Sequence, residues 1–385
     1  MARVCQVSLS DVATDGRILR TVHAMETEGH AVEIVDYGRG LEPPRFDLRH
    51  KLIEFSLKAP SNVLPAQWPL TVYWANPQNR KILRLIQDTR PDIIHAHNWP
   101  VLPAAARAAR NVGAKLVYDS HEFAQEERPG RRLWQLTYTA YIRALERLHI
   151  HHADAVITVS EGIADRLHSL YQLSCRPLVV ANMPEYVAIP HRPARQDRIL
   201  VHYHGIFTQS RGLRTLVRSV ALWPDRFRLR LTGWAQPPSF EANLRETAET
   251  AGVTGRVDFA PRVSLANLIQ HASEADIGAF VQGISNAQQL YTLPNKFFEY
   301  TMAGLMLIVG PGRDMRRYLE RHAHGIALDV TTAEALAVAI SNLDAETVTS
   351  FKRRALNAGR ILSWNEESIK LKALYRKLTG NAPMV

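Results

Sequence analysis

Residues 285–310 read SNAQQLYTLPNKFFEYTMAGLMLIVG, and this stretch decides the fold that we expect. Pro294 falls in the predicted first turn of a helix, where a backbone N–H has no partner inside the helix. The helix ends at Gly304, and the apolar run from Leu305 to Val309 is typical of a buried parallel strand. A polar loop, a helix and a buried strand in this order predict an α/β domain.

The same stretch contains groups that suit a phosphate and a sugar. Backbone amides and the dipole at the start of the helix attract an anion, and Lys296 adds a full positive charge. Glu299 follows about one turn later, where a carboxylate can accept hydrogen bonds from two sugar hydroxyls. Together these groups predict a nucleotide-sugar site. In the simpler alternative, Lys296 and Glu299 form a solvated pair on an amphipathic helix.

Length and composition predict a globular protein with two domains. The chain has 385 residues, 46% apolar and 22% charged. No apolar run approaches the ~18 residues that cross a membrane, and the N-terminus lacks the apolar core of a signal peptide. Cys5 and Cys175 are the only cysteines, too few for a disulfide framework or a zinc site. We therefore expect a cytoplasmic protein.

The formal net charge of +10 indicates a partner of opposite charge or needs another reason. The basic residues form no nucleic-acid motif, so we expect phosphates and a membrane surface rather than nucleic acid. Residues 128–152 predict a basic helix that includes Trp134, Tyr138 and Tyr141. Such a helix can lie on an anionic bilayer, or it can pack on its own domain with a charged outer face.

The first half of the chain alternates predicted strands and helices, which indicates a doubly wound parallel sheet. It contains no G-x-G-x-x-G motif. The loop after the first predicted strand carries Asp15, Gly16 and Arg17, at the edge where open parallel sheets bind ligands. Two interpretations stay open: the loop binds a ligand, or Asp15 caps the next helix and Arg17 lies on the surface.

Polar residues also end two later strands of this predicted sheet. His95 and His97 end one strand, and Asp119, His121 and Glu122 end the next. Strand alternation places His95 and His97 on one face. A zinc site is conceivable here, but no third ligand has a recognisable spacing. We single out His121 as a functional residue, with Asp119 and Glu122 as its neighbours.

The motif LPNKFFEY-x3-G resembles the donor-binding segment of the retaining GT-B glycosyltransferases of the group-one, family 4-like type. The resemblance implies two Rossmann-like doubly wound domains that face each other across a cleft. It implies that Glu299 binds the ribose of the donor. The segment YDSHEF resembles the histidine motif of the same family, which implies that His121 points toward the transferred sugar.

A second matching segment follows the predicted strand RILVHYHGIF. It resembles the family's G-R-L-x3-K-G segment, whose two cations hold the donor diphosphate. Gly205 matches, Ile206 replaces the first cation, and Arg211 replaces the second, so Lys296 is expected to supply the missing charge. The candidate catalytic residues are His121, Glu122, Asp119, Arg211 and Lys296. The candidate donor-binding residues are Gly16, Gly205, Arg211, Gly233, Arg262, Pro294, Asn295, Lys296 and Glu299.

The resemblance also implies the division of the chain. We expect an acceptor-binding domain at 1–190, a nucleotide-sugar domain at 198–365, and a helix at 366–385 that packs back on the first domain. The proline-containing segment 185–197 is the expected linker. The chain departs from the family at Tyr291, which stands where the first acid of a Glu-x7-Glu pair is expected. The transferred sugar and the retaining outcome therefore stay open.

These features predict a transferase that moves a sugar from a UDP- or GDP-sugar to a hydroxyl group of a lipid-linked or cell-surface glycan intermediate, at the inner face of the plasma membrane. The sequence contains no D-x-D motif, so we expect no metal and no cofactor besides the donor. Three alternatives stay open: a sugar-nucleotide 2-epimerase, a glycosyltransferase of natural products, and a catalytically inactive GT-B partner subunit.

Overall fold

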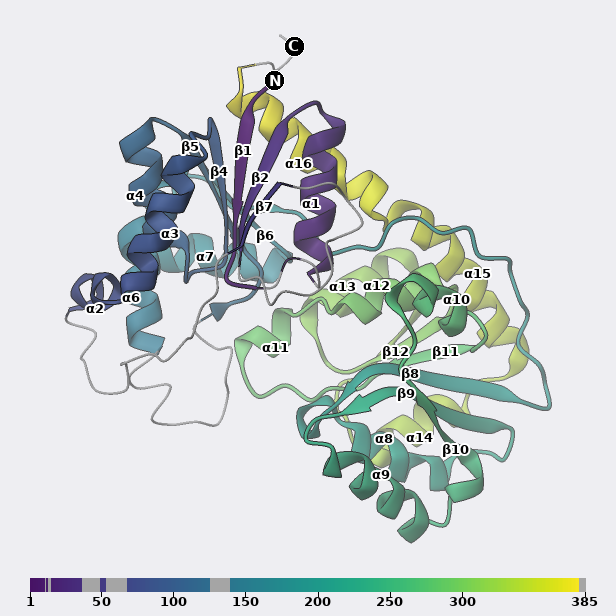
Figure 1. The fold of residues 1–385 in the computed structure, drawn as a ribbon. Helices are drawn as coiled ribbons and strands as arrows, with labels where there is room; N and C mark the ends of the chain where they lie inside the picture. Colours follow the sequence, from purple (N-terminus) through teal and green to yellow (C-terminus); the bar gives the residue numbers. More distant parts are fainter. Residues whose placement is uncertain (11, 13–14, 37–48, 53–67, 125–138, 381–385) are drawn as a thin grey trace. The chain divides into compact units, whose positions relative to one another are not determined.

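The computed structural model describes residues 1–385 except 11, 13–14, 37–48, 53–67, 125–138 and 381–385 (Figure 1). The chain forms two compact units, the first from Met1–Ala181 with Ser368–Val385 and the second from Asn182–Glu367. The division thus comes before the expected linker, and residues 185–197 belong to the second unit. Two hydrogen bonds explain this: Trp364 N–H donates to Pro184 O at 2.7 Å, and Ala194 N–H to Thr349 Oγ1 at 2.9 Å.

The first unit is built on a seven-stranded parallel sheet of order β3-β2-β1-β4-β5-β6-β7. The strand order reverses between β1 and β4, so the carboxyl ends of these two strands form a switch point where open sheets bind ligands. The strands are β1 (Arg3–Val7), β2 (Ala31–Asp36), β3 (Arg49–Leu52), β4 (Ile93–His97), β5 (Lys115–Ser120), β6 (Ala155–Thr158) and β7 (Leu178–Val179).

Helices pack on this sheet, and local signals set their ends. The Asp15 side chain accepts hydrogen bonds from the first amides of α1, and Gly113, with φ of 74°, ends α4. The helices are α1 (Gly16–Thr27), α2 (Pro69–Ala75), α3 (Pro77–Asp88), α4 (Leu102–Val112), α6 (Ala140–His149), α7 (Glu161–Tyr171) and α16 (Trp364–Leu378), of which the part from Ser368 onward belongs to this unit.

The second unit is built on a six-stranded parallel sheet of order β10-β9-β8-β11-β12-β13. Its strand order reverses between β8 and β11, which gives this unit a switch point of its own. The strands are β8 (Ile199–Phe207), β9 (Phe227–Ala235), β10 (Val257–Pro261), β11 (Ile277–Phe280), β12 (Met306–Val309) and β13 (Gly325–Ala327).

The stretch quoted at the outset forms a helix and a strand of this second unit. The helix starts at Asn295, one residue later than expected, because Pro294 is in an extended conformation and caps it. Phe297, Phe298 and Tyr300 are buried. The helices are α8 (Leu213–Ser219), α9 (Ser239–Thr250), α10 (Leu268–Ala272), α11 (Ala287–Tyr291), α12 (Asn295–Met302), α13 (Arg313–His322), α14 (Ala333–Ser341) and α15 (Ala345–Ile361).

Among the described residues, no helix combines the length and apolar character needed to cross a membrane.

Candidate functional site

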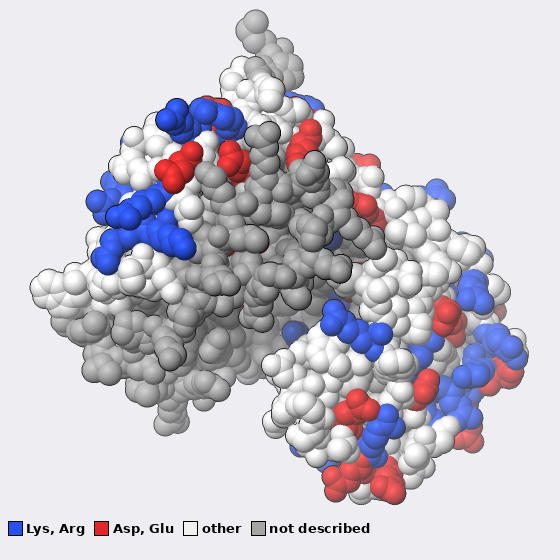
Figure 2. Space-filling model, in the orientation of Figure 1, with Lys and Arg blue, Asp and Glu red and all other residues white. Residues whose placement is uncertain are grey.

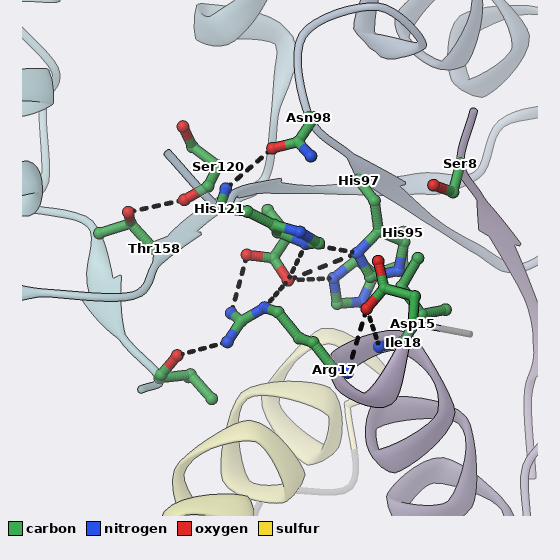
Figure 3. Close-up of polar contacts among 12 residues, drawn as sticks. Ser8, Asp15, Arg17, Ile18, His95, His97, Asn98, Ser120, His121 and Thr158 are labelled. Atoms are coloured by element: carbon green, nitrogen blue, oxygen red, sulfur yellow. Dashed lines mark hydrogen bonds and ion pairs between the residues drawn. The ribbon is translucent and has the colours of Figure 1, made fainter. Parts of the chain in front are cut away.

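A buried ion pair lies at the switch point of the first unit (Figure 3). Arg17 Nε and Nη2 donate to the two oxygens of Asp119 at 2.9 and 2.8 Å, and Nη1 donates to the Val180 carbonyl at 2.7 Å. Both side chains are almost fully buried. The expectation that Asp15 caps a helix is confirmed, but the accompanying surface position of Arg17 is wrong, because its guanidinium pairs with a carboxylate on β5.

Three histidines surround the same carboxylate. His95 Nε2, His97 Nδ1 and His121 Nε2 lie 3.5, 3.5 and 3.3 Å from Asp119 Oδ2. The rings of His95 and His97 stack with centroids 4.4 Å apart. Gln6 Oε1 lies 2.7 Å from His97 Nε2, so this nitrogen carries the proton. His97 Nδ1 therefore accepts, and His121 Nε2–H donates to it at 3.0 Å.

The charges of this group balance internally. Burial lowers the pKa of His95, and it lowers that of His97 to about 3, so both rings are neutral. Burial opposes ionisation of Asp119, but Arg17 and His121 hold the pKa of that carboxyl well below its usual value. Asp119 is 0% exposed and His121 14%, so Asp119 acts through His121 rather than on a ligand. Glu122 is exposed, and its carbonyl accepts from Ser120 Oγ.

This group also has the geometry of a metal site. Candidate ligand atoms of His95, His97 and Asp119 lie within 4.8 Å of one another, as for no other such group in the described part of the chain. Arg17 already binds both oxygens of Asp119 and neutralises it. A divalent cation would add two uncompensated charges beside a buried guanidinium. The donor set therefore does not fit a resident metal ion.

A second group of residues lies at the carboxyl edge of the second sheet. Lys296 Nζ lies 4.9 Å from the ring centroid of Tyr203 and 5.3 Å from that of Phe280. The guanidinium of Arg211 lies 5.8 Å from the centroid of Phe280. Arg211 also donates to Gln282 Oε1 at 2.8 Å. The structure thus brings the two predicted phosphate-binding cations to the same aromatic ring.

The electrostatics of Lys296 are unusual for a lysine. Removal from water is the largest cause that lowers its pKa, the positive charge of Arg211 is the second, and Glu299 opposes both. The result is a pKa of about 7. Desolvation and the neighbouring charge of Arg211 both disfavour the charged form of Lys296. An anion that binds here would stabilise that charged form, so the pair of cations suits an anionic ligand.

Two glycines permit this close packing. Gly205 and Gly233 face each other in the register of β8 and β9. A Cβ on Gly233 would lie 1.9 Å from the Gly205 carbonyl oxygen, and one on Gly205 would lie 3.3 Å from Lys296 Nζ. Both glycines have positive φ, of 113° and 154°. A side chain at either position would strain the backbone, and one at Gly205 would crowd Lys296.

A pocket of about 580 Å³ continues from Gly233 along the ends of β9 and β10. The Arg262 guanidinium lies 4.5 Å from the centroid of Trp234 in its wall. Two of the predicted donor-binding residues, Gly233 and Arg262, line this pocket. The pocket is lined by Gly233, Trp234, Ala235, Pro238, Glu241, Phe259, Ala260, Pro261 and Arg262.

Glu299 lies on α12 with its side chain 17% exposed, and His204 Nε2 lies 2.8 Å from its Oε2. Sequence reasoning missed His204, although two histidines at alternate positions before Gly205 were a signal. Asn295 Oδ1 accepts a hydrogen bond from Asn182 at 2.8 Å. Among the predicted donor-binding residues, Gly16 stands apart: it lies in the first unit, against the Arg20 side chain.

Residues 16–183, nearly all of which lie in the first unit, match the family model of the glycosyl transferase 4-like domain. The chain has the GT-B fold of two parallel α/β units, and with the family domain this fold indicates a glycosyltransferase.

Three solved structures illustrate the similarity of fold. A glycosyltransferase from Rickettsia africae is 15% identical, with 99% of both chains covered and a TM-score of 0.74. The Anabaena protein HepE in complex with UDP is 14% identical over 99% of this chain and 100% of that chain, with a TM-score of 0.72. WaaG, a glycosyltransferase involved in lipopolysaccharide biosynthesis, is 16% identical over 98% and 99%, with a TM-score of 0.67. A search of curated protein sequences found no match.

Proposed function

We propose that the protein transfers a sugar from a UDP- or GDP-sugar to a hydroxyl group of a lipid-linked or cell-surface glycan intermediate. One observation carries the proposal: Lys296, Arg211 and the Glu299 carboxylate gather at one sheet edge, beside the pocket that ends at Arg262. The binding of UDP by the structurally similar HepE supports the donor class.

The leaving group is the nucleoside diphosphate, and its developing negative charge requires fixed positive charge and amides. Lys296, Arg211 and the first amides of α12 after Pro294 supply these groups. The close backbones of Gly205 and Gly233 leave room for the phosphates. These side chains replace the divalent cation that a D-x-D motif would hold, so we propose metal-independent transfer.

His121 has a different role in this proposal. Its Nε2 faces Asp119 and His97, so the ring is held in one orientation with Nδ1 as the nitrogen that can contact a ligand. We assign His121 to orienting the transferred sugar or the acceptor. Because the departing phosphate can itself take the acceptor proton, retention of the anomeric configuration is proposed without a protein base, despite Tyr291.

The proposed lipid-linked acceptor and the cytoplasmic, membrane-facing location have their own support. WaaG, which shares the fold, acts in lipopolysaccharide biosynthesis. On α6, Arg143 and Arg147 are exposed, while Glu146 is buried and accepts from Tyr118. Arg128, Arg131, Arg132, Trp134 and Tyr138 lie outside the described residues. In the view of Figure 2, basic and acidic side chains are interspersed over the second unit.

The test is sugar transfer from UDP- and GDP-sugars to a polyisoprenyl-diphosphate saccharide or a lipid A saccharide in EDTA, followed by NMR of the anomeric proton in the product. We expect release of one nucleoside diphosphate, faster with acceptor than without, and a product with the donor's anomeric configuration. Product of inverted configuration would remove the retaining mechanism. An absence of release with every donor and acceptor would contradict the proposed activity and favour an inactive partner subunit.

A further inference from the structure

Glu299 ends a chain of buried polar side chains that runs through the second unit. The chain begins at Arg230 on β9, passes His202 and His204 on β8, and reaches Glu299 on α12. Arg230 Nε lies 3.3 Å from His202 Nδ1, His202 Nε2 lies 3.4 Å from His204 Nδ1, and His204 Nε2 lies 2.8 Å from Glu299 Oε2. Its two histidines are 0% and 3% exposed.

The two ends of this chain fix the direction of every hydrogen bond in it. The Arg230 Nε–H can only donate, so His202 accepts at Nδ1 and carries its proton on Nε2. That proton is donated to His204 Nδ1, and His204 therefore carries its own proton on Nε2 and donates it to Glu299. The same two tautomers follow when the hydrogen bonds are assigned from the Glu299 end, because a carboxylate can only accept. Burial also holds the pKa of His202 well below its usual value, so the ring is neutral.

Both ends of the chain are anchored. Arg230 Nη1 donates to Glu274 at 2.9 Å and Nη2 to the His271 carbonyl at 3.0 Å, so its guanidinium cannot turn away from His202. The His204 backbone N–H donates to Tyr300 Oη at 3.0 Å, which ties this part of β8 to the residue that follows Glu299. The chain therefore constrains the orientation of the Glu299 carboxylate.

We infer that His204, oriented by His202 and Arg230, is a positioning residue that presents the Glu299 carboxylate to the two ribose hydroxyls of the donor. The inference rests on the proposed function, because it assigns the ligand of that same site. A carboxylate held in one plane can accept from both hydroxyls of a vicinal diol, whereas a rotating carboxylate loses this geometry. The site is consequently selective for ribonucleotides over 2′-deoxyribonucleotides.

The first test reads the tautomers in the wild-type protein. Two-bond ¹H–¹⁵N spectra of protein labelled at its histidines distinguish a proton on Nε2 from one on Nδ1. Assignment uses His202→Phe and His204→Gln variants. We expect His202 and His204 to carry the proton on Nε2 between pH 7 and 8. A proton on Nδ1 of His204 would overturn the inference.

The second test measures affinity by calorimetry for UDP and 2′-deoxy-UDP, or for GDP and 2′-deoxy-GDP, whichever base the wild type binds. His204→Phe is expected to weaken binding of the ribonucleotide about tenfold, and to change binding of the deoxy form much less. His204→Gln keeps an N–H donor near the position of Nε2 and is expected to recover most of the preference. The matched control is His271→Asn, since the His271 side chain lies beside the chain without being part of it.

The outcomes separate the two proposals. If His204→Phe keeps the wild-type preference for the ribonucleotide, the positioning role is wrong while the donor site stands. If the wild type binds neither nucleotide pair, the proposed function itself is wrong. Thermal unfolding of each variant checks folding, and a His204→Phe protein that does not fold leaves the decision to the tautomer spectra of the wild type.

Discussion

Each unit buries histidines beside a carboxylate at the carboxyl edge of its sheet, but the two carboxylates have different surroundings. Asp119 is 0% exposed, and the guanidinium of Arg17 binds both of its oxygens. Glu299 is 17% exposed, and His204 Nε2 lies 2.8 Å from one of its oxygens. The first charge is compensated inside the protein, so Asp119 holds the structure in place. The second carboxylate is accessible to a ligand, as the proposed donor site requires.

The cations of the two regions differ in the same way. Arg17 has a full ion pair and a backbone carbonyl as partners. Lys296 lies among the rings of Tyr203 and Phe280, and burial lowers its pKa to about 7. An amine in such surroundings costs stability in the unliganded protein, and proteins keep such costs mainly where function needs them. Burial marks both clusters, but only the second holds a cation, Lys296, whose pKa is lowered, which is what the proposed site for an anionic ligand requires.

The largest expected effect concerns Asp119. Asp119→Ala leaves the Arg17 guanidinium buried without a counter-charge and is expected to lower the free energy of unfolding by ~3–5 kcal/mol. Glu299→Ala removes a partly exposed carboxylate and is expected to lower it by less than ~1 kcal/mol. Urea unfolding measures both. The double variant Arg17→Met with Asp119→Leu should recover much of the loss, and equal losses for the two single variants would contradict the comparison.

The next effect concerns His121. His121→Ala is expected to lower the turnover number of sugar transfer by about 10–100-fold, because an orienting contact is lost. The free energy of unfolding should fall by about 1–2 kcal/mol, because the contacts of His121 with His97 and Asp119 are lost. The affinity for the nucleoside diphosphate should not change. Full transfer activity in this variant would remove the role assigned to His121.

The smallest effect is a pH dependence. The pKa of Lys296 is lowered, so its charge is present below about pH 7 and is lost above it. Affinity for the nucleotide sugar, whose diphosphate diester does not titrate in this range, is therefore expected to fall about tenfold from pH 6 to pH 8. Lys296→Arg should abolish this dependence, because arginine stays charged. An equally steep fall in the arginine variant would assign the titration to another group.

Local signals in the sequence predicted much of the fold. The predicted strand RILVHYHGIF corresponds to β8, Ile199–Phe207, and the signals around Pro294 predicted the start of α12 to within one residue. These elements are determined by near neighbours in the chain. The family resemblance added the GT-B architecture.

The sequence could not determine which distant residues come into contact. Arg17 meets Asp119 across 102 positions, and His204 meets Glu299 across 95. No periodicity relates such residues, because the order of strands in the sheet decides which strand ends become neighbours. Arg17 was therefore compatible with a surface position, and His204 with an ordinary buried strand. For the same reason the end of the first unit, at Ala181, could not be located from the prolines of residues 185–197.

The central claim is that the second unit binds a nucleoside diphosphate through Lys296 without a metal. The most direct measurement is thermal unfolding in EDTA with UDP, GDP and dTDP, for the wild type, Lys296→Ala and the exposed control Lys377→Ala. A ligand at ~100 times its Kd adds about 2.7 kcal/mol to stability. We predict a higher Tm with UDP or GDP in the wild type and in Lys377→Ala, and a much smaller shift in Lys296→Ala. No shift with any nucleotide, or an equal shift in all three proteins, would contradict the account.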